Sequence, residues 1–150
     1  MIKLPVVIGP TAVGKTALAI KIARALSGEI VSADSVQIYR GMDIGSAKPT
    51  AEERRAAVHH MLDFADPASD FSVAEYKGLA RAAILDIAAR GALPILAGGS
   101  GLYVNAVLYD MDFSAPPPGN GFRESLMREA EEYGGARLHE RLRAADPEAA

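Results

Sequence analysis

Several residue types are missing or scarce in this chain of 150 residues, and each absence excludes a class of protein. The chain has no cysteine, which excludes a disulfide framework and a thiolate metal site. Its three histidines are too few to build a zinc centre by themselves. No apolar run approaches the roughly 18 residues that a membrane span needs, and no secretory signal pattern opens the chain. We therefore expect a cytoplasmic protein that does not bind membranes.

The charge balance excludes a protein that binds nucleic acid by bulk electrostatics alone. The formal net charge is −3, so a basic surface is not a property of the whole chain. With 49% hydrophobic and 23% charged residues, the chain can bury one good core. We expect a monomer.

One segment near the N-terminus has the complete pattern of a phosphate-binding loop. The loop consists of Gly9, Pro10, Thr11, Ala12, Val13, Gly14, Lys15 and Thr16. An apolar run precedes it and a helical pattern follows it, which is the context that the motif requires. Its backbone N–H groups and Lys15 suit a diphosphate, and the hydroxyl of Thr16 suits Mg2+. The alternative is a glycine turn that merely joins a strand to a helix.

The hydrophobic pattern up to residue 113 alternates between strands and helices. Strands are predicted at residues 4–8, 29–33 and 92–97, with Gly28 as the left-handed stop of the first helix. Capping boxes begin helices after Thr50 and Ser72, and Gly91 ends the second of these. This order predicts an α/β fold of the P-loop NTPase type, a parallel sheet with helices on both faces and ligands at the carboxyl ends of its strands.

The composition changes at residues 114–121, which are rich in proline and glycine and cannot continue a helix or strand. Residues 1–113 are therefore predicted to be an incomplete α/β core, and residues 122–150 the start of a helical insertion domain. The two helices expected there, 122–132 and 136–145, are too short to bury a core of their own. We expect the chain to be the N-terminal portion of a longer protein.

Four segments together resemble the tRNA dimethylallyltransferases. They are residues 9–16, 30–50, 59–63 and 98–103. The resemblance spans nearly the whole chain, and residues 34–49 are far more specific than the phosphate loop. It implies transfer of the dimethylallyl group from dimethylallyl diphosphate to N6 of adenosine 37 beside the tRNA anticodon. The products are N6-(dimethylallyl)adenosine and diphosphate, with Mg2+ as cofactor and the tRNA anticodon stem-loop as partner.

The resemblance also implies roles for individual residues. Asp34 matches the family's general base, together with Lys15 and Ser100 as catalytic residues; Ser100 replaces the threonine that is usual there. The residues that match tRNA-contacting positions are Asp34, Ser35, Val36, Gln37, Ser100 and Arg123. Most of them have a simpler alternative: Asp34 can organise Mg2+ or cap its loop, the Ser35–Gln37 stretch can be an ordinary turn, and Arg123 can be a solvated side chain. The pair His59 and His60 is expected to pack near the sheet rather than to bind metal.

Two other functions use the same phosphate loop. A small-molecule or nucleotide kinase also combines such a loop with an aspartate after the second strand. A regulatory nucleotide-binding module would need the loop and no catalytic residue. Both alternatives predict nucleotide binding, whereas the transferase predicts that the loop holds a diphosphate leaving group.

Overall fold

The computed structural model of the protein describes residues 2–109, 111, 113 and 121–150. The chain divides into two compact units, residues 1–111 and 112–150, which are described separately. The predicted boundary at 114–121 lies, except for Gly121, outside the described residues.

The first unit is built around a parallel sheet of four strands. The strands are β1 (Val6–Ile8), β2 (Gly28–Ala33), β3 (His59–His60) and β4 (Leu93–Gly98). Their order across the sheet is β1-β4-β2-β3, so the central pair is β2 and β4. The helices of this unit are α1 (Lys15–Leu26), α2 (Ala51–Ala56), α3 (Val73–Ala89) and α4 (Gly101–Leu108). A parallel sheet is confirmed, as the strand–helix alternation predicted.

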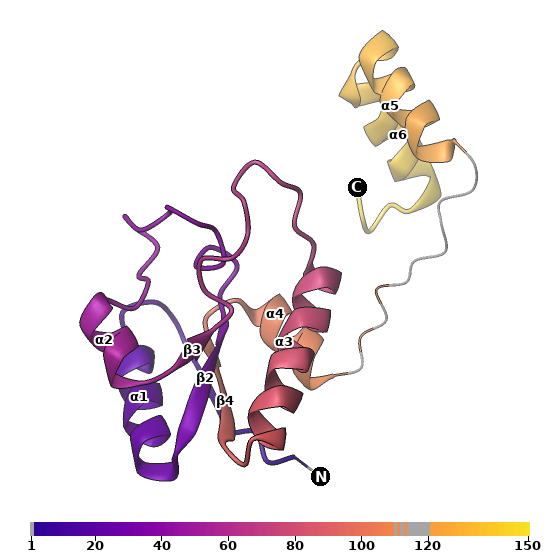
Figure 1. The fold of residues 1–150 in the computed structure, drawn as a ribbon. Helices are drawn as coiled ribbons and strands as arrows, with labels where there is room; N and C mark the ends of the chain where they lie inside the picture. The colour runs from indigo at the N-terminus through magenta and orange to yellow at the C-terminus, as the bar shows by residue number, and fades with distance from the viewer. Residues whose placement is uncertain (1, 110, 112, 114–120) are drawn as a thin grey trace. The chain divides into compact units, whose positions relative to one another are not determined.

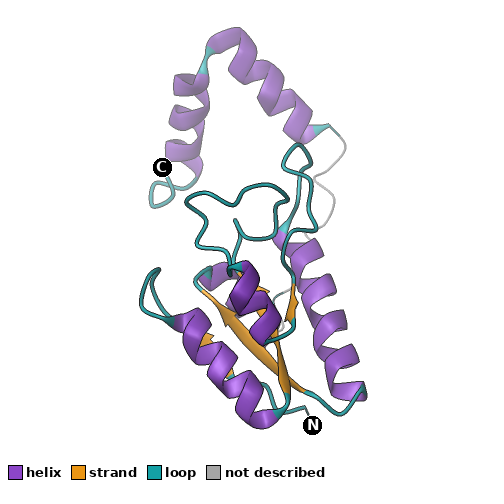
Figure 2. Ribbon diagram, turned by 60° about the vertical axis from the view of Figure 1, so that its left-hand side comes forward, coloured by secondary structure: helices purple, strands orange, loops and turns teal. Residues whose placement is uncertain are grey.

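Helices cover both faces of this sheet, because β2 and β4 are apolar on both sides. Figures 1 and 2 show α1 on one face and α3 with α4 on the other. On the α1 side, Ala19 and Ile20 pack with Ile30 and Ile95. On the opposite side, Val31 and Leu96 pack with residues of α3 and α4. The alternation of side chains along each strand sends neighbouring residues to opposite faces, which produces these two clusters.

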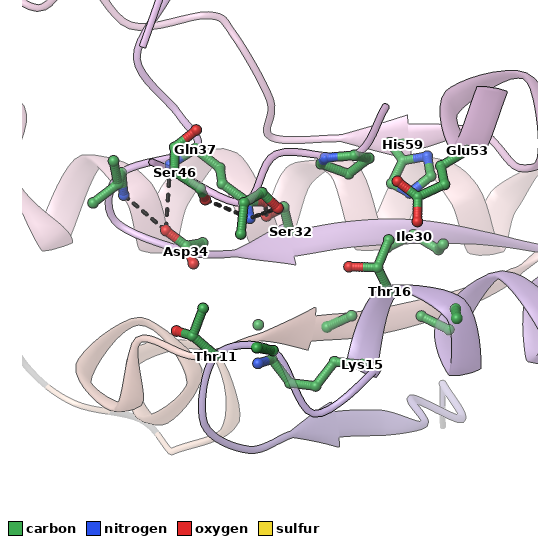
Figure 3. A pocket seen from close by; sticks show the side chains of 18 of the residues that line it. Thr11, Lys15, Thr16, Ile30, Ser32, Asp34, Gln37, Ser46, Glu53 and His59 are labelled. Atoms are coloured by element: carbon green, nitrogen blue, oxygen red, sulfur yellow. Dashed lines mark hydrogen bonds between the residues drawn. The ribbon is translucent and has the colours of Figure 1, made fainter. Parts of the chain in front are cut away.

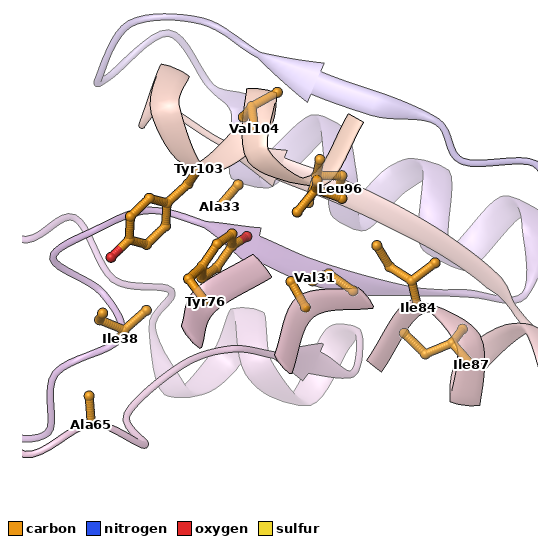
Figure 4. Packing of buried hydrophobic residues seen from close by; sticks show 12 residues of the cluster. Val31, Ala33, Ile38, Ala65, Tyr76, Ile84, Ile87, Leu96, Tyr103 and Val104 are labelled. Atoms are coloured by element: carbon orange, nitrogen blue, oxygen red, sulfur yellow. The ribbon is translucent and has the colours of Figure 1, made fainter. Parts of the chain in front are cut away.

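Two stacked tyrosines lie in the larger cluster, close to the carboxyl end of β2 (Figure 4). The rings of Tyr76 and Tyr103 are 4.0 Å apart between centroids. The hydroxyl of Tyr76 donates a hydrogen bond to the carbonyl oxygen of Ser32 at 2.9 Å, and burial raises the pKa of this phenol. The hydrogen bond satisfies a polar group that would be costly to bury alone. It also anchors α3 to β2 two residues before Asp34.

The predicted helix boundaries that depend on local hydrogen bonds are confirmed. Thr50 and Ser72 each accept a hydrogen bond from the backbone of the glutamate three residues later, and each glutamate returns one. Gly91, which follows the C-cap residue Arg90 of α3, has a φ of 79°, the left-handed conformation that ends a helix. These contacts lie within a few residues, so the sequence alone specifies them.

The prediction that Gly28 stops α1 is wrong. Ser27 adopts the left-handed conformation, with φ of 50°, and Gly28 is already the first residue of β2. Glycine is needed there for a different reason: a Cβ at position 28 would lie 2.7 Å from the carbonyl oxygen of Leu93 on β4. The predicted strands also shift by one or two residues, since β1 is confined to Val6–Ile8 and β4 extends to Gly98.

An ion cluster joins the start of β2 to β3 and to the end of α3. Glu29 accepts hydrogen bonds from Arg90 at 2.5 and 2.9 Å and contacts Nε2 of His60 at 2.6 Å. The hydrogen bonds from Arg90, with that of His60, lower the pKa of Glu29 from 4.5 to about 2 against the opposing effect of burial. The folded protein therefore binds this proton less readily than the unfolded chain.

This difference predicts a pH dependence of folding stability. Because the pKa of Glu29 is depressed in the folded state, its stabilising contribution is complete above about pH 4.5 and is lost as the pH falls towards 2. We expect Glu29→Gln to reduce the slope of the unfolding free energy against pH in this window. Urea unfolding followed by circular dichroism between pH 2.5 and 7 measures it, and an unchanged slope would contradict the prediction.

The second unit contains two helices, α5 (Phe122–Tyr133) and α6 (Gly135–Ala145), separated at Gly134. The division at Gly134 and Gly135 matches the predicted one within a residue. Neither helix buries a side chain fully. Glu129 of α5 binds Arg137 and Arg141 of α6, so ion pairs contribute to joining the two helices. No helix within the described part of the chain is long and apolar enough to cross a membrane.

Candidate active site

A cavity of about 420 Å³ opens between the phosphate loop and the carboxyl ends of β2 and β4. Figure 3 shows Thr11, Lys15 and Thr16 on one side of it and Asp34, Gln37 and Ser46 on the other. Its far wall is formed by Ile30, Glu53 and His59. The cavity lies where open parallel sheets bind their ligands, as predicted. Of the predicted diphosphate-binding and catalytic residues it brings together Asp34 and five members of the phosphate loop, whereas Ser100 is not among the residues that line it.

The phosphate loop is folded for contact with an anion. Ala12 and Gly14 have φ values of 68° and 88°, so the backbone alternates in handedness and can turn successive N–H groups inward. Gly14 precedes α1 without a side-chain cap, and no acidic residue lies in the first turn of the helix. The helix N-terminus therefore keeps its donors and its positive dipole for a ligand. Lys15 spans the loop, its ammonium donating to the carbonyl oxygen of Pro10 at 2.6 Å.

Asp34 follows directly after β2 and faces the cavity. Its Oδ1 accepts hydrogen bonds from the backbone N–H groups of Val36 at 2.9 Å and Gln37 at 3.3 Å. Asp34 therefore does cap its loop, as one of the alternatives for this residue predicted. It occupies one carboxylate oxygen only, and Oδ2 makes no hydrogen bond to the described residues. Asp34 is thus held in a fixed orientation with one oxygen available to a ligand.

Ser100 connects the turn after β4 to the turn after β2. Its Oγ accepts a hydrogen bond from the backbone N–H of Ser35 at 2.8 Å and lies 3.1 Å from Oγ of Ser35. The backbone N–H of Ser100 donates to the carbonyl oxygen of Ala33 at 3.1 Å. Serine keeps the hydroxyl of the threonine that is usual at this position and lacks only its methyl group. Through that hydroxyl, Ser100 fixes Ser35, the residue next to Asp34.

The side-chain amide of Gln37 is bound within the protein. Its Nε2 donates to the carbonyl oxygens of Ser46 at 3.2 Å and Ala47 at 2.9 Å. Its Oε1 accepts from Oγ of Ser32 at 3.2 Å. Both donors of the amide are used by the loop of residues 43–47, so the tRNA contact predicted for Gln37 can use only its remaining acceptor capacity. The contact itself stays a prediction.

A buried lysine that the sequence analysis did not identify holds this same loop. The side chain of Lys48 is 4% exposed, and its ammonium donates to Asp63 at 2.5 Å, Asp43 at 3.0 Å and the carbonyl oxygen of Tyr39 at 2.7 Å. Burial alone would lower the pKa of Lys48, but the two carboxylates outweigh it and raise the pKa. Asp63 also binds Arg54 at 2.6 Å. The only signal in the sequence is that Lys48 and Asp63 both lie in the segments that carry the family resemblance.

His59 and His60 pack at the sheet, as expected, in the short strand β3. Nδ1 of His59 lies 2.8 Å from the carbonyl oxygen of Ala57, and its Nε2 is buried without a hydrogen-bond partner among the described residues. Burial lowers the pKa of His59, which favours the neutral ring. Among the described residues, no group of three or more histidine, cysteine, aspartate or glutamate side chains could hold a metal ion.

Arg123 lies on the exposed surface of α5 in the second unit. It belongs to a different unit from the residues that line the cavity. Its tRNA contact remains a prediction.

The sheet order, the loop and the cavity define a phosphate-loop α/β protein. Comparison with known families makes this more specific, since the model of the family described as IPP transferase matches residues 37–150. The chain belongs to the IPP transferase family.

Curated relatives and solved structures agree with this assignment. The chain is 56% identical to a tRNA dimethylallyltransferase of Exiguobacterium sp. and 53% identical to that of Bacillus subtilis, over 100% and 99% of its length. Among solved structures it is similar to the tRNA isopentenylpyrophosphate transferase of Bacillus halodurans, with 46% identity and a TM-score of 0.75 over 99% of the chain. A eukaryotic dimethylallyltransferase acting on tRNA gives 27% identity and a TM-score of 0.77 over 98% of the chain.

The chain spans about half the length of the bacterial proteins and a smaller share of the eukaryotic one. It covers 49% of the Exiguobacterium and 48% of the Bacillus subtilis relative, 49% of the Bacillus halodurans structure and 37% of the eukaryotic one. The relatives are named as transferases that modify tRNA, and these comparisons give no support to the kinase alternative.

Proposed function

We propose that this chain forms the catalytic core of an enzyme that transfers the dimethylallyl group of dimethylallyl diphosphate to N6 of adenosine 37 in tRNA. Diphosphate and N6-(dimethylallyl)adenosine are the products. One observation supports the proposal above all: the phosphate loop and the free carboxylate oxygen of Asp34 face the same cavity. Such a reaction needs an anion-binding site for the leaving group and a base for the amine. The names of the relatives support the choice of substrates.

The phosphate loop would act on the leaving group. The allylic carbon becomes electrophilic as its bond to the diphosphate oxygen breaks and negative charge develops on that oxygen. The loop comprises Gly9, Pro10, Thr11, Ala12, Val13, Gly14, Lys15 and Thr16. Its N–H groups, the helix dipole and the ammonium of Lys15 stabilise this charge without having to reorganise.

The residues at the end of the loop fit a magnesium ion bound together with a diphosphate. Thr16 faces the cavity next to Lys15 (Figure 3), and the described residues offer no cluster of carboxylates or histidines. Mg2+ commonly takes few protein ligands and completes its shell with phosphate oxygens and water. Thr16 would hold the ion by its hydroxyl. The ion would supply positive charge at the departing oxygens.

Asp34 is proposed as the general base. As the adenine amine attacks the allylic carbon, one N6 proton must leave, and a carboxylate oxygen within hydrogen-bond reach can accept it. Oδ1 is occupied by two backbone donors, so Oδ2 is the oxygen that would receive the proton. Ser100 would assist by fixing Ser35 beside Asp34.

The tRNA contacts are proposed for Val36 and Gln37, which line the cavity, for the bonded pair Ser35 and Ser100 beside Asp34, and for Arg123 in the second unit. The enzyme would act as a monomer in the cytoplasm. The net charge of −3 supplies little general attraction to RNA, so these local contacts would have to position the anticodon stem-loop.

The proposal predicts that Lys15→Ala abolishes measurable binding of pyrophosphate in the presence of Mg2+. The substitution removes the cationic side chain of the phosphate loop, and a charged hydrogen bond to phosphate is among the strongest that a protein makes. Isothermal calorimetry on the 150-residue chain measures the affinity. Lys21→Ala on the exposed side of α1 is the matched control and should bind as the unchanged chain does. Equal affinity of the Lys15 variant would refute the loop as the diphosphate site.

A further inference from the structure

The loop of residues 43–47 borders the cavity but has no helix or strand to define its shape. Gly45, Ser46 and Ala47 line the cavity directly. Gly45 and Ala47 have φ values of 76° and 51°, and the side chain of Ile44 is fully exposed. With so little apolar packing, the loop depends on polar contacts to keep one conformation.

Lys48, the residue directly after the loop, ties the loop to the rest of the unit. Its ammonium reaches Asp43 at the start of the loop, Tyr39 before it and Asp63 on the segment after β3. Arg54 joins the same cluster by an ion pair with Asp63. Because the Lys48 side chain is only 4% exposed, its ammonium is bound by three protein oxygens in place of water. Removal of the Lys48 ammonium would take a donor from the carbonyl oxygen of Tyr39 and from one oxygen of Asp63, so the cluster favours one arrangement of the loop.

The loop in turn fixes the amide of Gln37. Two carbonyl oxygens, of Ser46 and Ala47, can be satisfied only by the NH2 end of that amide, and this decides which way round the amide lies. Oε1 accepts from Ser32 and keeps acceptor capacity. Gln37 thus offers the cavity an acceptor and no donor. A hydrogen-bond acceptor suits an amine of the ligand. The backbone N–H of Gln37 also donates to Asp34.

We propose that Lys48 is a positioning residue: by closing the loop of residues 43–47 it fixes Gln37 as an acceptor for the amine of the nucleic acid substrate. This inference rests on the proposed function. Lys48 touches neither substrate in this scheme, and it acts only through Ser46, Ala47 and Gln37.

A double-mutant cycle in the full-length enzyme tests the proposal. We expect Lys48→Met to lower kcat/KM for an anticodon stem-loop on the order of tenfold, with KM for dimethylallyl diphosphate unchanged. In a Gln37→Ala background the same substitution should cost less than about twofold, because the group it positions is gone. Lys21→Met makes the same chemical change on the exposed side of α1 and should have no effect in either background.

A spectroscopic measurement on the 150-residue chain provides a readout independent of catalysis. In nuclear magnetic resonance spectra, the side-chain amide protons of Gln37 should exchange with water at least about tenfold faster in the Lys48→Met variant. If that variant does not fold, Asp43→Ala takes its place, since Asp43 is 69% exposed and contributes only one of the contacts of Lys48.

The outcomes separate the two levels of the argument. Equal losses from Lys48→Met with and without Gln37, or unchanged exchange of the Gln37 amide, would overturn the positioning role. An unsubstituted full-length enzyme that transfers no dimethylallyl group would instead overturn the proposed function. Loss of the Lys48 effect in the Gln37→Ala background, with faster amide exchange, supports the inference.

Discussion

Replacement of Asp34 by asparagine in the full-length enzyme is expected to lower the rate of dimethylallyl transfer by roughly 10²- to 10⁴-fold, the usual contribution of a general base. Asparagine keeps the shape of the side chain, and its amide oxygen can still accept the hydrogen bonds from Val36 and Gln37. It lacks the basicity needed to take the N6 proton. Substrate affinity should therefore change little while the chemical step slows.

A magnesium titration separates this role from metal binding. If Asp34 organised Mg2+, high concentrations of the ion would restore much of the lost rate, and diphosphate would bind more weakly at low Mg2+. Single-turnover transfer to an anticodon stem-loop, measured across the titration, should instead show a loss that Mg2+ does not repair. Asp70→Asn, in an exposed loop, is the matched control and should leave the rate unchanged.

Replacement of Gly98 by alanine is expected to destabilise the first unit by about 3 kcal/mol, at the upper end of the usual cost of overpacking. A Cβ at position 98 would lie 2.0 Å from the carbonyl oxygen of Ala33 and 2.4 Å from its carbon. Both are backbone atoms of β2, so no side chain can rotate to relieve the contact. The central strand pair would have to separate at the point where it supports Asp34 and Ser100.

Urea unfolding of the 150-residue chain measures this effect, and Gly78→Ala is its control. Gly78 lies inside α3, and a Cβ there would meet no atom within 4 Å. Alanine at position 78 should stabilise the protein by about 0.5–1 kcal/mol, since it removes the entropic cost of a helical glycine. Equal stabilities of the two variants would show that β2 and β4 are not in close contact at Gly98.

Features of the fold that depend on neighbouring residues could be predicted from the sequence. The capping boxes at Thr50 and Ser72 and the glycine stop at Gly91 each involve contacts a few residues apart. The alternation of strands and helices likewise implied a parallel sheet with two covered faces. The strand β3 was missed because two residues, His59 and His60, carry no periodic pattern that could be recognised.

Features that depend on distant backbone could not be predicted in the same way. Gly28 was assigned to a helix end by its position in the sequence, but its role is set by Leu93 on a neighbouring strand. The same holds for Lys48, whose partner Asp63 is 15 residues away and becomes its neighbour only once β3 pairs with β2. Burial turns these charged residues, which would be solvated on a surface, into structural ones.

In the candidate site, too, features carried by local sequence could be predicted and features that depend on the folded loop could not. The phosphate loop was recognised from its own residues, and Asp34 from a family resemblance combined with its place after a strand. The internal use of the Gln37 amide was not foreseen, because the carbonyl groups that bind it, those of Ser46 and Ala47, carry no sequence signal. Any residue can supply a carbonyl oxygen, so only the folded loop identifies these partners.

The most direct test of the account is to measure transfer of a radiolabelled dimethylallyl group from dimethylallyl diphosphate to an anticodon stem-loop by the full-length enzyme that contains this chain. We predict that label is incorporated at N6 of adenosine 37, that diphosphate is released in equal amount, and that Lys15→Ala abolishes both. Phosphate transfer from ATP to a small molecule, with no label in the RNA, would contradict the account.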